Sequence, residues 1–571
     1  MVSPEGHGKT VVILGAGVGG LTAAHELLRR GYQVEVYERN AEPGGIARSA
    51  TEPDGEHNEV AWHAVAGGYN HLLRILGEIP AADGKGTVAE HLVPTHVIMY
   101  GRTGDKTFVD LGNSFITAGG VRKFLDLRRE MGASRVTLRD VAKMGALLGF
   151  VRFAHPGRLE RYEGVTWETL IADLSDEAKV WASNLLGTFT GMDPRAVSAH
   201  CYLHLARAER MADFPGATRS PDGDPISFYH FDGPMNRTWF DPWVRHLQSL
   251  SVRVHLSTPI AEIRCSAGRV EELLLSTGEI VRADHYVTAL DPGALARVLR
   301  GAEDLSSRMA ELDARSRVLQ MQVAFTFDEK IIYEGQTVLA MPDAPWCLLV
   351  RAEGSYWKAP MSLGTGKTRE ILSAAFAIPD APGILYGKPA HACTREEIVE
   401  EIWAQFKQAR GVLRAFRTED GRTIDDLKYT SARIWHSFQF DPVKARMTTY
   451  EPKFSNNVGT LPLRPSIEEP TLRNLVHGGA YARTDCNTHH MEAAAEAGVR
   501  AANLIATGRA SAAFERYPEP GGMLGALRRM DRALLARGYR HPLELLMTPA
   551  DVARKIYGST SPLAEVDGQP T

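Results

Sequence analysis

Residues 10–38 carry the feature that most limits how this chain can fold. A short apolar, β-branched run at 10–14 is followed at once by a glycine-rich turn. A helical stretch at 21–30 and a second short strand-like run at 33–37 come next. The first run is typical of a buried parallel strand. The order of strand, glycine turn, helix and strand therefore predicts the beginning of a parallel α/β sheet.

Each glycine of the turn has its own task, and an acid ends the second strand. Gly15 permits the tight turn, Gly17 lets a diphosphate approach the backbone, and Gly20 lets the helix pack on the strand. The free amides and the positive dipole end of the helix attract that diphosphate. Glu38 stands where an acid binds an adenosine ribose, which argues against a 2′-phosphate. A glycine-rich turn alone would be weak evidence, but here all the parts arrive in order. The residues expected at this end are Gly15, Ala16, Gly17, Gly19, Gly20 and Glu38.

Residues 39–49 resemble the second glycine motif of the flavin amine oxidase and phytoene desaturase superfamily. In that superfamily a glycine pair, a basic residue and a hydroxyl hold the diphosphate and ribityl chain of the flavin. The resemblance implies FAD as the cofactor. Ile46 stands where the superfamily has its basic residue, so Arg48 is expected to take that role. The matching residues are Arg39, Gly44, Gly45, Arg48 and Ser49.

The far end of the chain carries a second part of the resemblance. Residues 474–481 look like the late strand and glycine turn of the superfamily, and residues 490–498 look like the helix that follows. In the superfamily this helix points its N-terminus at the flavin ring, where its dipole stabilises negative charge. Ala480 stands in place of the usual acid, and Asp485 is a candidate replacement. The resemblance implies further cofactor contacts from Ala64, Ile260, Gly479, Ala480, His490, Met491 and Glu492.

These motifs imply a fold in the α/β class. We expect a Rossmann-type FAD-binding domain, like those of p-hydroxybenzoate hydroxylase and glutathione reductase, with a mixed α+β substrate domain. Internal repeats are absent. The expected FAD-binding domain is discontinuous and comprises 8–90, 241–292 and 446–510. The expected substrate domain comprises 91–240 and 293–445, followed by a C-terminal helical segment at 511–558 and a disordered tail at 559–571.

Three residues are candidates for the wall that faces the flavin ring. Amine oxidases carry a flavin-facing lysine near the start of the strand that matches 318–328, and Gln320 occupies that place here. This substitution argues against amine oxidation. The superfamily lays the segment matching 59–69 beside the ring, which makes Trp62 and His63 candidates. Ordinary packing under a helix is the alternative for both. His489 and His490 are expected to cap the late helix or to support the site from behind.

Composition excludes several other classes of protein. Lys and Arg total 65 against 69 Asp and Glu, a net charge of −4, which argues against a nucleic-acid partner. The five cysteines lie far apart without a CxxC pair, which excludes a disulfide scaffold and a zinc ribbon and fits a reducing compartment. No metal site is predicted. No apolar run approaches the length of about 18 residues that a membrane span needs, and a cytoplasmic location is expected.

Two basic, amphipathic stretches suggest contact with a membrane surface. Residues 122–162 carry ten Lys or Arg and four Asp or Glu, and residues 521–558 carry seven and three. Such helices can lie in the interface of an anionic leaflet. Packing on the core with a solvated basic face is the alternative for each. A peripheral membrane location is therefore a hypothesis at this stage.

The predicted function is FAD-dependent oxidation or reduction of an apolar, isoprenoid or lipid-like substrate. Hydride would move between flavin N5 and a substrate C–H, as in a desaturase or dehydrogenase, and the chain resembles the hydroxysqualene dehydroxylase-like or carotenoid desaturase-like branch. No acid–base or nucleophile constellation is recognisable by spacing, which suits hydride transfer. The alternatives are a non-redox flavin isomerase, an amine or amino-acid oxidase, and a flavin-free binding protein of the same fold. The sequence leaves the substrate, electron acceptor and oligomeric state open.

Overall fold

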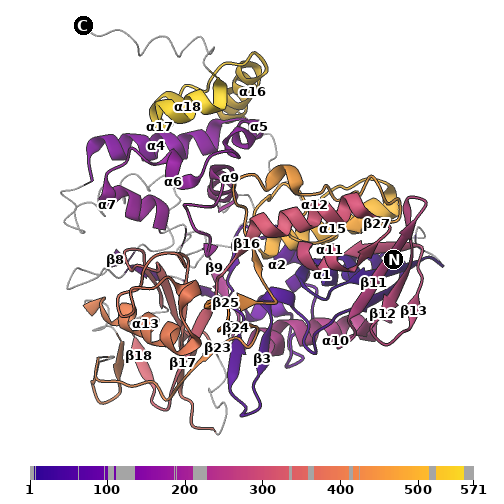
Figure 1. Cartoon of the computed structure of the whole chain (residues 1–571), viewed down its shortest axis with the longest axis horizontal. Coiled ribbons are helices and arrows are strands. Elements are labelled where there is room, and N and C mark those ends of the chain that lie inside the picture. Colours follow the sequence, from indigo (N-terminus) through magenta and orange to yellow (C-terminus); the bar gives the residue numbers. More distant parts are fainter. Residues whose placement is uncertain are drawn as a thin grey trace.

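The computed structural model describes the chain from residue 6 to residue 558, with gaps. A five-stranded sheet with its helices forms one body, a seven-stranded sheet forms a second, and a group of helices lies beside them (Figure 1). The residues outside the description are 1–5, 7, 62, 96, 101–108, 111–135, 185–186, 188–189, 210–227, 334–336, 358–365, 411–415, 424, 513–521 and 559–571. Trp62 and the predicted tail therefore lie outside the described residues.

The five-stranded sheet is parallel throughout and has the order β10-β2-β1-β14-β27. It brings together three segments that are distant in sequence, which is the grouping expected from the nucleotide motifs. The Rossmann-type fold class is confirmed. Its strands are β1 Thr10–Leu14, β2 Gln33–Tyr37, β10 Arg253–His255, β14 His285–Thr288 and β27 Leu475–His477.

Two helices, one from each end of the chain, pack closely together against this sheet. They are α1 (Val18–Leu28) and α15 (Met491–Thr507). A Cβ on Gly19 would lie 2.0 Å from the carbonyl oxygen of Gly478, and one on Gly498 would lie 2.5 Å from the carbonyl oxygen of Gly19. The absence of a side chain at these positions therefore lets the late turn and helix approach the first helix.

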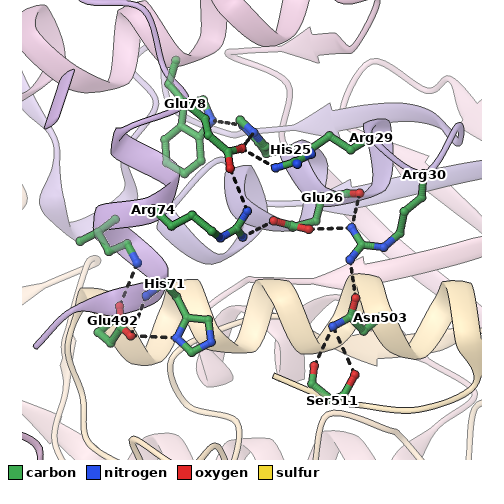
Figure 2. A network of polar contacts seen from close by, with 12 residues as sticks. His25, Glu26, Arg29, Arg30, His71, Arg74, Glu78, Glu492, Asn503 and Ser511 are labelled. Atoms are coloured by element: carbon green, nitrogen blue, oxygen red, sulfur yellow. Dashed lines mark hydrogen bonds and ion pairs between the residues drawn. The ribbon is translucent and has the colours of Figure 1, made fainter. Parts of the chain in front are cut away.

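A network of charged residues ties α1 and α15 to α2 (Asn70–Leu76) and the residues after it (Figure 2). Glu26 accepts hydrogen bonds from Arg30 at 2.6 Å and from Arg74. Glu78 binds Arg29 at 2.5 Å and Arg74 at 3.1 Å. These contacts link elements that are far apart in sequence and fix the position of α2 beside the glycine turn.

The opposite face of the parallel sheet is covered by a second, four-stranded sheet and two helices. Leu295, Leu305 and Leu312 pack into one apolar cluster with Val12 and Leu14. Residues 293–316, expected in the substrate domain, therefore pack with the nucleotide-binding sheet, because their apolar faces cover a side of it that would otherwise face water. The elements are β11 Ile260–Ser266, β12 Arg269–Leu275, β13 Ile280–Val281, β15 Leu299–Arg300, α11 Pro292–Val298 and α12 Glu303–Ser316.

The second body is built on a sheet with the order β23-β17-β21-β20-β19-β7-β8. Its central strands are buried along their whole length, because α13 (Arg395–Lys407) and neighbouring segments pack against it. The strand expected over 318–328 is divided, with β16 (Arg317–Val318) pairing elsewhere. The strands are β7 Val97–Tyr100, β8 Val109–Asp110, β17 Gln322–Phe327, β19 Thr337–Met341, β20 Leu348–Ala352, β21 Glu370–Phe376 and β23 Ser431–Ile434.

Short strand pairs and one longer helix complete the described elements. Within the described residues, β16 pairs with β26 (Lys453–Phe454), and β9 (Phe228–His230) pairs with both β5 (Val65–Ala66) and β6 (Val93–Thr95). The remaining elements are β3 Ser49–Thr51, β4 His57–Glu59, β18 Ile331–Tyr333, β22 Phe416–Thr418, β24 Phe438–Asp441, β25 Arg446–Thr449 and α10 Asp241–Ser249.

The described parts of the two basic stretches pack against each other. Arg158 is buried and donates from Nε to both carboxylate oxygens of Asp531, at 2.7 and 2.9 Å. Phe150 and Met547 lie in one apolar cluster, and the yellow C-terminal helices lie beside α4 in Figure 1. None of the described helices has the length and apolar character to cross a bilayer. The helices here are α4 Leu138–Phe153, α5 Pro156–Leu159, α6 Trp167–Leu170, α7 Asp176–Lys179, α9 Ala199–Glu209, α16 Gly522–Ala536, α17 Glu544–Met547 and α18 Ala550–Tyr557.

Candidate functional site

A cavity of about 600 Å³ begins at the glycine turn and reaches the seven-stranded sheet. Its first end is lined by the turn after β1 and by the segment after β2. Its middle is lined by the segments before β5 and α15, and its far end by β19, β20 and β21. Predicted residues that line it are Gly15, Gly17, Gly19, Glu38, Arg39, Gly44, Gly45, Arg48, His63, Ala64, Ile260, Gln320, Gly479, Ala480, His490 and Met491.

The two glycine motifs are joined directly at the first end of the cavity. The amide of Gly44 donates to the carbonyl oxygen of Ala16 at 2.8 Å, and Gly17 and Gly44 form an isolated bridge. A Cβ on Gly17 would come no closer than 3.8 Å to any described atom, the Cα of Gly45. The space before Gly17 is therefore open to a ligand, and the residues present fit an extended dinucleotide whose diphosphate rests on backbone amides.

Glu38 is held at the end of β2 by backbone and side-chain donors. Its carboxylate accepts from the amide of Ala16 at 2.8 Å, and from the backbone and side-chain nitrogens of Asn40 at 3.0 and 2.8 Å. A carboxylate oxygen has more than one lone pair, so these bonds leave acceptor capacity for a ribose hydroxyl. Glu38 thus both orders the turn and lines the adenosine end.

Arg48 is buried in a group of interactions behind the second glycine motif. It donates to Glu451 at 2.5 Å and to the carbonyl oxygen of Gly45 at 2.8 Å, and its guanidinium lies 4.9 Å from the ring centre of Trp435. The Trp435 indole donates to the other oxygen of Glu451 at 2.8 Å. Because Glu451 neutralises its charge, Arg48 fixes the shape of the cradle as well as lining it.

The start of α15 lies on the cavity, as the resemblance implies. His490 is the N-cap and accepts from the amide of Ala493 at 3.3 Å. Gly479 and Ala480 line the cavity beside it. Asp485, the candidate replacement for the missing acid, does not line the cavity and pairs instead with Arg500 at 2.8 Å. The N-terminus of α15, where the helix dipole is positive, therefore faces the cavity without an acidic side chain from Asp485 beside it.

Four predicted cofactor residues lie behind the cavity wall. Ala16 belongs to the turn, and Gly20 lies in the first turn of α1, where a Cβ would lie 2.0 Å from the carbonyl oxygen of Gly15. Ser49 exchanges hydrogen bonds with Asn236 at 2.7 and 2.9 Å. Glu492 is fully buried and accepts hydrogen bonds from the start of α2, including the His71 ring at 2.8 Å (Figure 2). These residues shape the site without lining it.

Gln320 lines the cavity between β16 and β17, in contact with a lysine that the sequence reasoning missed. Lys453 Nζ donates to the side-chain oxygen of Gln320, and to the carbonyl oxygen of Thr190 at 2.8 Å. Because the amine of Lys453 contacts Gln320, this part of the cavity does contain an amine, and the glutamine at residue 320 is not evidence against amine oxidation. Lys453 belongs to the segment 451–460, whose distinctive composition was the feature of the sequence that could have pointed to it.

The imidazoles around Lys453 are held neutral by their surroundings. Burial lowers the pKa of His63 to about 4, and the amine of Lys453 contributes in the same direction. Burial also lowers the pKa of His489 well below its usual value, with Lys453 the next cause. Burial lowers the pKa of Lys453 itself to about 7. This end of the cavity therefore holds neutral imidazoles beside an amine that is about half protonated near neutral pH.

The parallel sheet, the glycine turn and the cavity that begins there are features of a dinucleotide-binding protein. The chain belongs to the flavin containing amine oxidoreductase family, whose model matches residues 18–506. Membership confirms the superfamily resemblance, the oxidoreductase class and the predicted flavin cofactor, FAD.

Individual relatives agree with this assignment at low identity. A zeta-carotene desaturase from Synechocystis is 25% identical over 300 residues, covering 50% of this chain and 58% of that protein, less than two thirds of its length. A carotenoid phi-ring synthase from Streptomyces griseus is 23% identical over 558 residues, 93% of each chain. Among solved structures, an oxidoreductase from Methanosarcina mazei is similar with a TM-score of 0.56 at 14% identity, covering 86% of this chain and 98% of that one. That likeness shows the fold.

Proposed function

We propose that this protein is an FAD-dependent desaturase or dehydrogenase that acts on an apolar, isoprenoid or lipid-like substrate. The observation that carries the proposal is the cavity, which joins a dinucleotide cradle to an apolar wall. That wall comes from the helical region and the seven-stranded sheet. Its residues are Leu205 on α9, Phe228 on β9, and Val338, Leu349 and Ala375 on the seven-stranded sheet.

Bound FAD supplies the hydride acceptor or donor, and the residues of this chain bind and orient the reactants. Glu38 and the amides near Gly17 hold the adenosine and diphosphate. The apolar wall replaces water around the substrate, which favours a hydrocarbon over a charged molecule. The relatives named as zeta-carotene desaturase and carotenoid phi-ring synthase make carotenes the first substrates to test.

The test is an anaerobic reaction of the purified yellow protein with zeta-carotene or 15-cis-phytoene dispersed in detergent. We expect the oxidised flavin absorbance to bleach while a product with one more double bond appears by mass spectrometry. Bleaching by an amine such as putrescine, and not by either carotene, would overturn the proposal in favour of an amine oxidase. Turnover that needs reduced flavin without consuming it would favour the isomerase alternative, and a colourless protein would favour the flavin-free binding protein.

We also propose that the C-terminal helices rest on an anionic membrane surface. Apolar side chains are exposed there beside basic ones: Met523 is 79% exposed and Leu546 is 62% exposed. Such a face can insert shallowly into the headgroup region. We expect the protein to float with vesicles that contain anionic lipid, and the double variant Met523→Ser, Leu546→Ser to float less. Equal recovery of both proteins, or no flotation of either, would refute the proposal.

A further inference from the structure

Lys453 brings an amine into the cavity without a carboxylate to pair with it among the described residues. Its two acceptors, the side-chain oxygen of Gln320 and the carbonyl oxygen of Thr190, are both neutral. Lys453 lies on β26, whose partner strand β16 ends just before Gln320. A buried amine bound only by neutral acceptors has little to stabilise its charged form, and burial lowers the pKa of Lys453 to about 7.

The carboxylates that line the cavity are all engaged elsewhere. Glu38 binds Ala16 and Asn40, and Asp291 caps α11 by accepting from the amide of Ala294 at 2.8 Å. Glu451, two residues before Lys453, is bound by Arg48 and Trp435. The imidazoles of His63 and His489 interact with the amine and offer it no counter-charge. The buried carboxylate that acts on His63, that of Glu59, pairs with His57 at 3.1 Å and with Arg351 at 3.6 Å.

The acceptor for this amine is held in place by the backbone. Gly191 has a φ of +61°, and a Cβ there would lie 1.5 Å from the side-chain nitrogen of Gln320. The Gln320 amide therefore rests directly on Gly191, with its oxygen turned to Lys453. A carboxylate in the same place would keep the amine protonated, whereas an amide leaves it able to exist with a free lone pair.

We propose that Lys453 is the base that accepts the proton released by the substrate, an inference that rests on the proposed desaturase function. Desaturation removes a hydride from one carbon and a proton from its neighbour. The hydride carries two electrons to the flavin. The second C–H bond breaks, its electron pair becomes the new bond between the carbons, and its proton binds the Nζ lone pair. The ammonium then shares the cavity with the negative charge gained by the cofactor, which stabilises both.

The first test measures flavin reduction potential against pH in the purified holoprotein, without substrate. In the oxidised protein the amine is neutral above about pH 7. When the flavin of the wild type takes up two electrons in that pH range, the amine should bind one proton, and Lys453→Met, which has no amine there, should bind one proton fewer. One proton corresponds to about 29.6 mV per pH unit in a two-electron couple. We expect the wild-type slope to be steeper by that amount between about pH 7 and the higher pKa that the amine has in the reduced protein, and equal to the variant's slope below pH 7.

Two further variants sharpen this test. Gln320→Glu places a carboxylate beside the amine and should move the onset of the steeper slope to higher pH. Lys444→Met alters a lysine whose side chain is 72% exposed, and it should keep the wild-type profile. Equal slopes in the wild type and Lys453→Met at every pH would overturn the proposal. With the true substrate, Lys453→Met should also lower the rate of flavin reduction about 10²–10⁴-fold, the usual contribution of a positioned base.

A measurement that needs no flavin separates this proposal from the proposed function. Acetylation of lysines by acetic anhydride, followed by mass spectrometry across pH, reports the neutral fraction of each amine. Lys453 should reach half reactivity near pH 7, and Lys444 near the ordinary lysine value of about 10.4. A colourless protein would refute the proposed function. Half reactivity of Lys453 at the ordinary lysine value would refute the assignment of Lys453 as a base.

Discussion

A matched pair of alanine substitutions in the glycine turn separates cofactor binding from folding. At Gly17 the backbone has a φ of −77°, which alanine adopts without strain, and the added methyl would meet only the Cα of Gly45 at 3.8 Å. At Gly20 the same methyl would lie 2.0 Å from the carbonyl oxygen of Gly15. The two sites are three residues apart, and the structure has room for a methyl group at Gly17 but not at Gly20.

The expected magnitudes follow from these contacts. Gly17→Ala should leave the folded protein unchanged or more stable by about 0.4–1 kcal/mol, because it restricts the unfolded chain. It should weaken FAD binding by about 1.5–3 kcal/mol, roughly 10- to 150-fold, because the methyl occupies the space through which a charged diphosphate reaches the amides. Gly20→Ala should destabilise the fold by about 1–3 kcal/mol or more, since the turn must open to admit the methyl.

The assay is FAD titration of deflavinated protein by fluorescence quenching, combined with urea unfolding of the same samples without FAD. Gly17→Ala should bind FAD more weakly without a lower urea unfolding midpoint. Gly20→Ala should unfold at a lower urea concentration. Unchanged FAD affinity in Gly17→Ala would refute the placement of the diphosphate at this turn. An unchanged unfolding midpoint in Gly20→Ala would refute the steric reading of the turn.

Three further predictions concern the framework around the site. Glu492→Gln should lower the free energy of unfolding by about 1–3 kcal/mol, because one buried donor at the start of α2, such as the His71 amide, loses its acceptor. An unchanged urea unfolding midpoint would contradict this. Burial raises the pKa of Glu78, but the His25 hydrogen bond and the Arg74 and Arg29 charges outweigh it and lower the pKa to about 2. Ionised Glu78 therefore stabilises the fold fully above its ordinary pKa of about 4.5, and this stabilisation should be lost as the pH falls toward 2. Acid titration of Glu78→Gln by circular dichroism should show a shallower loss, and an identical curve would contradict the assignment. Arg158→Met should cost about 3–5 kcal/mol by stranding Asp531, and adding Asp531→Leu should restore most of it; equal damage in single and double variants would refute the pairing.

The nucleotide-binding half was predictable because its signals are local. The turn after β1 contains the residues whose backbone must accept a diphosphate, and the acid at Glu38 follows within the same structural unit. The late turn at Gly479 was found through resemblance, because its place beside the first turn depends on a sheet that joins the two ends of the chain. The packing of α11 and α12 on the nucleotide-binding sheet was not visible in the sequence, because local pattern does not reveal which sheet face an amphipathic helix covers.

The position of Lys453 beside Gln320 could not be predicted from local sequence motifs, because it depends on the pairing of two distant strands. Gln320 was identified as a position from which an amine is absent, yet the pairing of Val318 with Lys453 brings an amine to it from 133 residues further along the chain. Neither residue is unusual in its own segment. The chemistry arises from their contact, from the glycine that holds the Gln320 amide, and from the burial that lowers the pKa of Lys453 to about 7. Two strands that are distant in sequence therefore supply the amine and its acceptor, and only their pairing places both groups in the cavity.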